Sequence, residues 1–201
     1  LTEVEDVYRP FKQKKKTRAS VAIEKGLQPL ADLIYAQQTT EGDISELAAP
    51  FVNAEKGVEN SEQALKGAAD IIAEMISDDA ELRKSLREIL KNEADISAKQ
   101  INPEKEEGRV YEMYADHSEK IAKIPAHRVL AINRGEKEEC LKVGIVEDRE
   151  AALAKVKAAH VKGDSIFRGL LEATAEDAYD RLIFPSIERE VRNEPTDMAN
   201  E

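Results

Sequence analysis

The feature that most constrains the fold is a helical spacing of apolar residues between positions 61 and 90. The first set of apolar positions is Leu65, Ala68, Ile72, Met75 and Ile76, and the second is Leu82, Leu86, Ile89 and Leu90. Ser77, Asp78 and Asp79 separate the two sets. Residues three or four apart share one face of a helix, so the spacing predicts two amphipathic helices, and the short link between them predicts that they pack as a hairpin.

The composition favours the same fold class. Aromatic residues make up 4% of the 201 residues and Trp is absent, so the core has to be built from aliphatic side chains. Charged residues reach 35%, which is high for a soluble domain and is typical of helices with charged outer faces. We therefore expect a mainly α protein, a multi-helical bundle-like array with a few short β strands.

Turn and capping residues place the other elements. Further helices are expected over residues 17–25, 27–37, from 43, 126–133 and 148–162, then from a cap at Asp164 or Ser165 and from Pro185. Phe167, Leu170, Leu171, Thr174, Ala178 and Leu182 are expected on the inner face of the last long helix, and Pro195 is expected to kink or stop the terminal one. Extended pieces are predicted at residues 96–101 and 109–114, and alternation predicts a strand at 141–145.

The loss of long helical periodicity near Asp95 suggests a division of the chain. One interpretation is a helical subdomain over residues 1–95, carrying a basic loop, and a mixed, then helical subdomain over residues 96–201. A single domain is the alternative, because 201 residues suit either arrangement.

Residues 9–18 contain six cations and no acid, in a chain whose net charge is −11. The six are Arg9, Lys12, Lys14, Lys15, Lys16 and Arg18. Without this segment the remaining 191 residues carry 24 Lys and Arg against 41 Asp and Glu, a net charge of −17. An acidic body of this kind repels phosphates over most of its surface, so a phosphate-binding role has to be confined to the basic segment.

Three interpretations of the basic segment stay open. Its cations can neutralise nucleic-acid phosphates without reading sequence, with Phe11 stacking on a base or anchoring the loop. They can instead pair with the acidic helices of the same chain or be solvated. A nuclear-import-like string at residues 12–18 is a third interpretation, and no other feature of the chain supports it.

Residues 17–37 have the outline of a helix-turn-helix, with Ala22, Gly26 and Leu27 at the small, turn and apolar positions. The second helix has no Arg or Lys to contact phosphate and includes Asp32, so a helix pair used for packing is the better explanation.

Residues that could support catalysis or bind a metal are few and dispersed. His117, His127 and His160 stand far apart, Cys140 is the only cysteine, and none has the spacing of a zinc site. No glycine-rich loop of the phosphate-binding kind is present. We therefore predict a protein that is not an enzyme and has no cofactor and no metal. A single cysteine indicates a reducing compartment, and no apolar run is long enough for a membrane span.

Four stretches together resemble the N-terminal part of the bacterial Tex family of transcription accessory proteins. They are residues 4–19, 24–34, 51–58 and 127–136, the last being His127-Arg-Val-Leu-Ala-Ile-Asn-Arg-Gly-Glu136. The resemblance follows the family's order and covers most of the chain. It implies mostly helical subdomains related to the core of a eukaryotic elongation factor. A ribonuclease-H-like domain, helix-hairpin-helix motifs and an RNA-binding OB-fold would lie beyond Glu201.

The family's nucleic-acid binding is credited mainly to that OB-fold, and no catalytic residue of the family maps onto this chain. We therefore expect a non-catalytic helical scaffold with weak, sequence-independent contacts to RNA or DNA through the six basic residues. The alternative is a protein–protein interaction module of the transcription machinery. The chain begins with Leu1 and not Met, and we interpret it as a piece of a longer protein or a processed product, located in the cytoplasm without a membrane partner.

Overall fold

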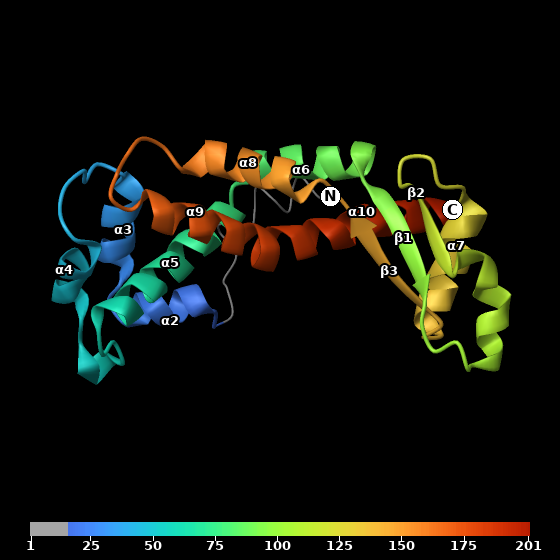
Figure 1. Cartoon of the computed structure of the whole chain (residues 1–201), viewed down its shortest axis with the longest axis horizontal. Helices are drawn as coiled ribbons and strands as arrows, with labels where there is room; N and C mark the ends of the chain where they lie inside the picture. The colour runs from blue at the N-terminus through green and yellow to red at the C-terminus, as the bar shows by residue number, and fades with distance from the viewer. Residues whose placement is uncertain (1–15) are drawn as a thin grey trace. The chain divides into compact units, whose positions relative to one another are not determined.

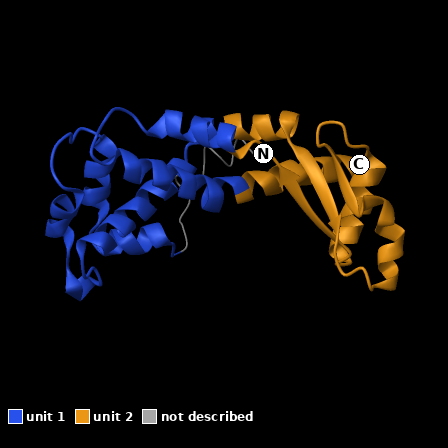
Figure 2. Ribbon diagram, viewed as in Figure 1, with its two compact units in different colours: residues 1–83, 150–184 blue, residues 84–149, 185–201 orange. Residues whose placement is uncertain are grey.

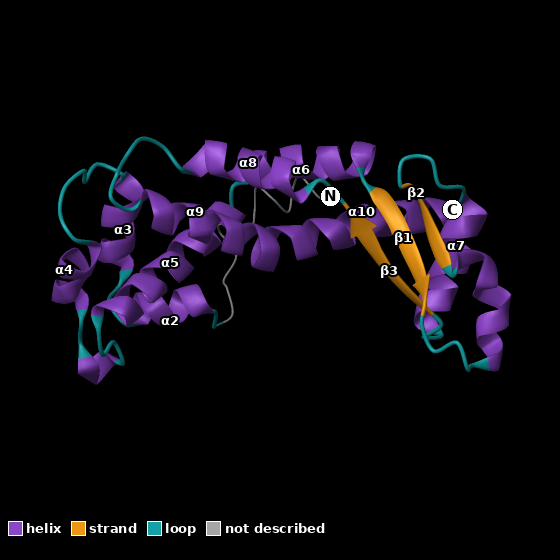
Figure 3. Ribbon diagram, viewed as in Figure 1, coloured by secondary structure: helices purple, strands orange, loops and turns teal. Residues whose placement is uncertain are grey.

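A computed structural model describes residues 16–201 and consists mainly of helices with one small sheet (Figure 3). The predicted mainly α fold with a few short strands is confirmed. The chain divides into two compact units, shown in Figure 2. Unit 1 comprises residues 1–83 and 150–184, and unit 2 comprises residues 84–149 and 185–201. Each unit thus combines two separate stretches of the sequence, whereas the division expected near residue 95 was continuous.

Unit 1 is built around helix α5, Ser61–Ser77. The other helices of this unit are α2 Arg18–Glu24, α3 Gln28–Ala36, α4 Ile44–Ala48, α8 Arg149–His160, α9 Arg168–Asp177 and the π-helix η5 Ala178–Ile183, with short 3-10 turns η2 Ala49–Phe51 and η3 Ala54–Lys56. Helix α5 packs against α2, α3, α4, α9 and η5 (Figure 1). Ala68, Ile72 and Ile76 on α5 are almost completely buried, so the aliphatic core predicted from the sequence lies here.

Helices α2 and α3 have the predicted positions and pack on α5, as the packing interpretation expects. Thr17 caps α2 in a reciprocal capping box with Ser20, which satisfies two backbone donors at the start of the helix. Gly26 ends the helix with φ of 80°, a conformation that glycine adopts without steric cost.

The predicted helix hairpin is wrong. Helix α6, Ala80–Glu93, starts at the predicted break, and the Asp79 side chain accepts from the Leu82 backbone N–H at 3.1 Å. However, most of α6 belongs to unit 2, and the apolar stripe of α5 is covered by helices of unit 1. Met75 is 42% exposed and Ile71 is buried in its place, since the buried stripe of α5 runs through Ile71, Ile72 and Ile76.

The end of unit 1 shows a change of helical register. The inner face was expected to continue from Ala178 to Leu182, but Ile183 is the fully buried residue and Leu182 is only half-buried. The π-helix η5 explains the shift, because an i→i+5 turn contains one extra residue and rotates everything after it. The predicted cap at Asp164 or Ser165 is also wrong, since α9 begins after Phe167.

Unit 2 contains the sheet. Its strands are β1 Asp95–Gln100, β2 Asp116–Lys120 and β3 Leu141–Val146, in the antiparallel order β2-β1-β3. Around them lie α7 Ala126–Lys137, α10 Phe184–Ala199, the 3-10 helix η4 Glu106–Tyr114 and most of α6. The strands predicted at residues 96–101 and 141–145 are confirmed. Strand β2 was not predicted, since its sequence is polar throughout.

Three local predictions in unit 2 are wrong, the last of them the stop of the terminal helix at Pro195. Residues 109–114 lie within η4 and are not extended, and Tyr111 and Tyr114 are buried three residues apart, as the three-residue turn of a 3-10 helix requires. Helix α7 continues through Gly135 to Lys137, and the missing side chain at Gly135 leaves room for Leu141, whose Cδ1 lies 2.5 Å from where a Cβ would stand. Helix α10 continues past Pro195, where the Thr196 hydroxyl donates to the Arg192 carbonyl at 3.1 Å.

Candidate nucleic-acid interface

The basic residues predicted to contact nucleic acid fall into two groups. Arg9, Lys12, Lys14 and Lys15, together with Phe11, lie outside the described residues. Lys16 and Arg18 are described and exposed, and both line a groove in unit 1. The structure therefore brings two of the six predicted cations to one place and adds others that the sequence reasoning missed.

The groove has a volume of about 430 Å³ and lies between the start of α2, the Gly57 turn and the first turns of α5. We call it the basic groove. Its charged lining residues are Lys16, Arg18, Lys25, Lys66 and Asp70. Four cations thus face one carboxylate, although the chain as a whole is acidic. Concave surfaces lined by one sign of charge focus the electric field, so a basic groove is suited to attract an anion.

Each additional lysine of the basic groove stands directly before a glycine. Lys25 precedes Gly26 and Lys66 precedes Gly67, while Lys56 precedes Gly57 at the neighbouring turn. The stem of Lys25 runs 3.5 Å from where a Cβ on Gly57 would stand, and the Lys56 Nζ lies 3.6 Å from the matching point on Gly26. The repeated Lys-Gly pair is the sequence signal that could have located this site.

The floor of the basic groove is apolar and closely packed. Leu27 and Val58 are 1% exposed, and Ala22 lies beside them. Gly67 permits this packing, because a Cβ there would stand 2.3 Å from the Leu27 Cδ1. The floor is thereby fixed by the packing of α5 against the α2–α3 turn, and the cations are held around it.

The cations of the basic groove have no direct ion-pair partner in the described part of the chain. Within residues 16–201, no ion pair shorter than 4 Å involves Lys16, Arg18, Lys25 or Lys66, and the same holds for Lys56. Of the alternative interpretation, pairing with acidic helices or solvation, the described residues show no direct ion pair for Lys16 or Arg18, and both side chains are exposed.

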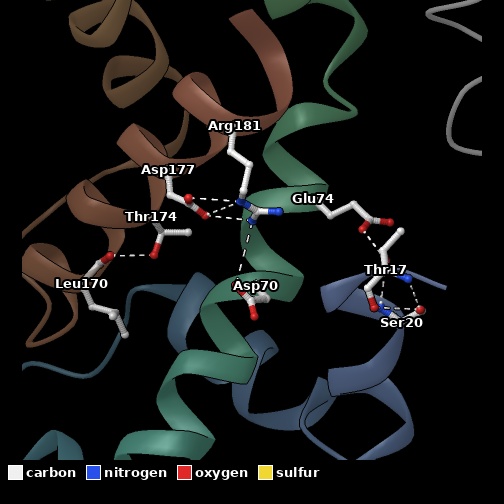
Figure 4. Close-up of polar contacts among 8 residues, drawn as sticks. All are labelled: Thr17, Ser20, Asp70, Glu74, Leu170, Thr174, Asp177 and Arg181. Carbon is white, nitrogen blue, oxygen red and sulfur yellow. Dashed lines mark hydrogen bonds and ion pairs between the residues drawn. The ribbon is translucent and has the colours of Figure 1, made fainter. Parts of the chain in front are cut away.

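The negative charge of Asp70 is partly compensated by Arg181, which is not among the residues lining the groove. Its Oδ1 lies 3.9 Å from Nη2 of Arg181 on η5, and Arg181 in turn donates from Nη2 to the Asp177 carboxylate at 2.8 Å (Figure 4). Burial raises the pKa of Asp70, while Arg181, Arg18 and Lys66 lower it in part, and Asp177 raises it. The net direction is upward, so the surroundings of Asp70 disfavour its charge.

Thr17 fixes the start of α2 on α5. Its hydroxyl donates to the Glu74 carboxylate at 2.9 Å, and its backbone N–H donates to the Ser20 hydroxyl at 2.7 Å (Figure 4). Lys16 and Arg18 flank this residue, so the same contacts set the position from which both cations reach the groove.

The histidines and the cysteine have other roles. His160 is 8% exposed, and its Nδ1 and Nε2 lie 2.8 Å from the Tyr35 hydroxyl and 2.9 Å from the Asp79 carboxylate. His117 lies 2.7 Å from Glu119, and Cys140 is buried in the core of unit 2. Among residues 16–201, no three His, Cys, Asp or Glu side chains are grouped as a metal site would require. In the same range, no helix has the length and apolarity needed to cross a bilayer.

These observations define a mainly helical protein of two units with one basic groove. Comparison with known proteins gives the family. Residues 39–201 match the family model described as Tex central region-like. The chain is 45% identical over its whole length to the YdcI protein of Bacillus subtilis, 38% identical to the transcriptional accessory protein Tex of Neisseria gonorrhoeae, and 37% identical to the protein tex of Bordetella pertussis. The last two similarities cover 72% and 74% of this chain.

The chain belongs to the Tex family of transcription accessory proteins, as its resemblance indicated. It spans 28% of the Bacillus relative and 18% and 19% of the other two. The activities of the full-length relatives are therefore assigned to this chain only as a proposal.

Proposed function

We propose that this chain is a non-catalytic helical scaffold within a Tex-like transcription accessory protein and that it makes sequence-independent contacts with nucleic acid. One observation carries the proposal: Lys16 and Arg18, from the predicted basic segment, share a groove with Lys25 and Lys66, and none of them is paired with a carboxylate among the described residues. Unpaired Lys and Arg side chains bind phosphates by releasing condensed counterions, with no requirement for a base sequence. The proposal places the protein in the cytoplasm, with RNA or DNA as its partner.

Titration of labelled RNA and DNA with the 201-residue chain at several salt concentrations tests this function. The logarithm of the binding constant is expected to fall linearly with the logarithm of the salt concentration, by roughly 0.7 per phosphate contact on a single strand and 0.9 on a duplex. Replacing Lys14, Lys15 and Lys16 with Glu is expected to weaken binding to all sequences alike. Binding that is unchanged by this triple replacement would remove the basic segment from the proposal.

A second candidate function is a protein-interaction module of the transcription machinery. Val110 and Met113 on η4 are 73% and 74% exposed and stand three residues apart, so they lie on one side of the 3-10 helix. Large exposed apolar side chains placed together are more typical of contact surfaces than of solvated ones. Affinity capture from a bacterial lysate, with and without nuclease, separates the two functions. A transcription protein that stays bound after nuclease, and is lost in a Val110→Ser, Met113→Ser variant, favours the second.

A further inference from the structure

We propose that the basic groove is a structured binding site for one strand of nucleic-acid backbone. It would hold about one nucleotide's sugar with its two flanking phosphates, and Lys25 and Lys66 would provide contacts that do not depend on the N-terminal basic segment. This inference rests on the proposed function and names the ligand of the same site.

The cations of the basic groove come from separate elements of the fold. Arg18 starts α2, Lys25 ends it, and Lys66 stands in α5, so three separate points of the fold direct positive charge into one groove. Their backbone positions are fixed before any ligand arrives, because α2 packs on α5 and Thr17 is bonded to Glu74. A preorganised set of cations loses less entropy on binding than cations that become ordered only with the ligand, and so contributes more affinity per contact.

The size and the lining of the basic groove suit a nucleotide unit. A volume of about 430 Å³ is within the roughly 300–1,000 Å³ range of pockets that hold small organic ligands, so a nucleotide unit has room there. The half-buried Val21 lines the groove and provides an apolar side chain that suits the C–H face of a sugar. The rim presents ammonium and guanidinium groups, which suit phosphate oxygens.

The described lining of the basic groove offers no base recognition. Among residues 16–201, none that lines the groove is aromatic, so no ring from this part of the lining is placed to stack on a base. Aromatic stacking is what most single-strand binders add to their charged grooves. The site therefore grips the backbone and is indifferent to sequence, as a general transcription accessory protein requires.

Asp70 limits the affinity of the site. Its carboxylate lines the groove and lies near Arg18 and Lys66, where it repels an approaching phosphate. Replacing Asp70 with Asn keeps the shape of the side chain and removes the charge, while Arg181 keeps its hydrogen bonds to Asp177. The Asp70→Asn variant should bind single-stranded RNA about 3- to 10-fold more tightly at low salt, since a like charge within one Debye length is removed.

The test is fluorescence anisotropy with a labelled 12-nucleotide uridine RNA at 50 to 300 mM salt, using the 201-residue chain. Lys25→Glu with Lys66→Glu should weaken binding at least about 10-fold and reduce the salt slope by about 1.4, two contacts at roughly 0.7 each. The matched control is Lys155→Glu with Lys162→Glu, which makes the same change in net charge at exposed positions away from the groove. This control should change binding less than about 2-fold, and equal thermal unfolding midpoints establish that both variants fold.

The outcomes separate this inference from the proposed function. If the unaltered chain does not bind RNA or DNA, the proposed function fails. If it binds, and replacing Lys14 and Lys15 with Glu weakens binding while the groove variant equals its control, the groove inference alone is overturned. Competition by polyglutamate as effective as that by RNA of equal charge would also overturn it, since the groove would then take any polyanion.

Discussion

The Asp70 carboxylate lies 3.9 Å from Nη2 of Arg181, on the inner side of the basic groove. Arg181 is already hydrogen-bonded to Asp177, so it compensates the charge of Asp70 only in part. The Asp70 carboxylate also interacts electrostatically with Arg18 and Lys66. The relationship gives the groove one internal negative charge that can be titrated or removed.

Binding to single-stranded RNA is expected to strengthen as the pH falls from neutral into the acid range where Asp70 takes up a proton. The pKa of Asp70 is raised, so its charge is lost at a higher pH than that of an ordinary Asp, and the groove becomes more positive. Anisotropy titrations across this pH range check the prediction, and the Asp70→Asn variant should show a smaller change. A pH dependence identical in both proteins would exclude Asp70 as its source.

Gly67→Ala is expected to lower the free energy of unfolding by about 1–3 kcal/mol, the usual cost of overpacking a core. The added Cβ would stand 2.3 Å from Cδ1 of Leu27, which is buried and has no free volume to enter. Gly169→Ala on the exposed start of α9 is the control, since no atom other than those of its chain neighbours and its own helix backbone lies within 4 Å of the added Cβ. Denaturant titration of both variants should show a loss for the first and no loss for the second.

Tyr111 is expected to make the chain sensitive to alkali. Burial raises its pKa to about 12, and the hydrogen bond to Glu138, at 2.6 Å, adds to the increase. A raised folded-state pKa gives stability that is present below pH 10 and lost as the pH rises toward 12. Thermal unfolding between pH 9 and pH 12 should show a steeper loss in the unaltered chain than in Tyr111→Phe. Equal slopes would contradict the assignment.

His160→Phe is expected to destabilise unit 1 by about 1–3 kcal/mol, since it leaves two buried or half-buried partners without their hydrogen bonds. The imidazole joins the Tyr35 hydroxyl to the Asp79 carboxylate, and Asp79 also caps α6. His127→Phe at an exposed position is the control and should change stability by less than about 0.5 kcal/mol. A smaller loss for His160 than for His127 would show that the bridge does not stabilise the fold.

The sequence predicted elements best where capping and periodicity agree. The start of α5 at Ser61 and the cap of α2 by Thr17 depend on neighbouring residues only, and both were predicted. The register change at η5 and the continuation of α7 through Gly135 depend on residues distant in the chain or on a non-standard turn. No local pattern reveals these features. Leu141 approaches Gly135 only in the folded chain, so the need for glycine there cannot be seen in the neighbouring sequence.

The candidate site was predicted in part for the same reason. Lys16 and Arg18 were identified because they belong to a run of cations. Lys25 and Lys66 stand singly among acidic and neutral residues, and only the packing of α2 on α5 brings them to the same groove. Charge runs locate the part of a site that is continuous in sequence, whereas tertiary structure supplies the remainder.

Unit 1 is built from two separate stretches of the sequence, and this affects how the chain folds during its synthesis. On the ribosome, α5 emerges before α9 and η5, which cover part of it and follow the end of α5 after a stretch of 90 residues, 78–167. At synthesis rates of about 5–20 residues per second, this part of α5 stays uncovered for roughly 4.5–18 s. A nascent chain in that state is a substrate for chaperones until its second half arrives.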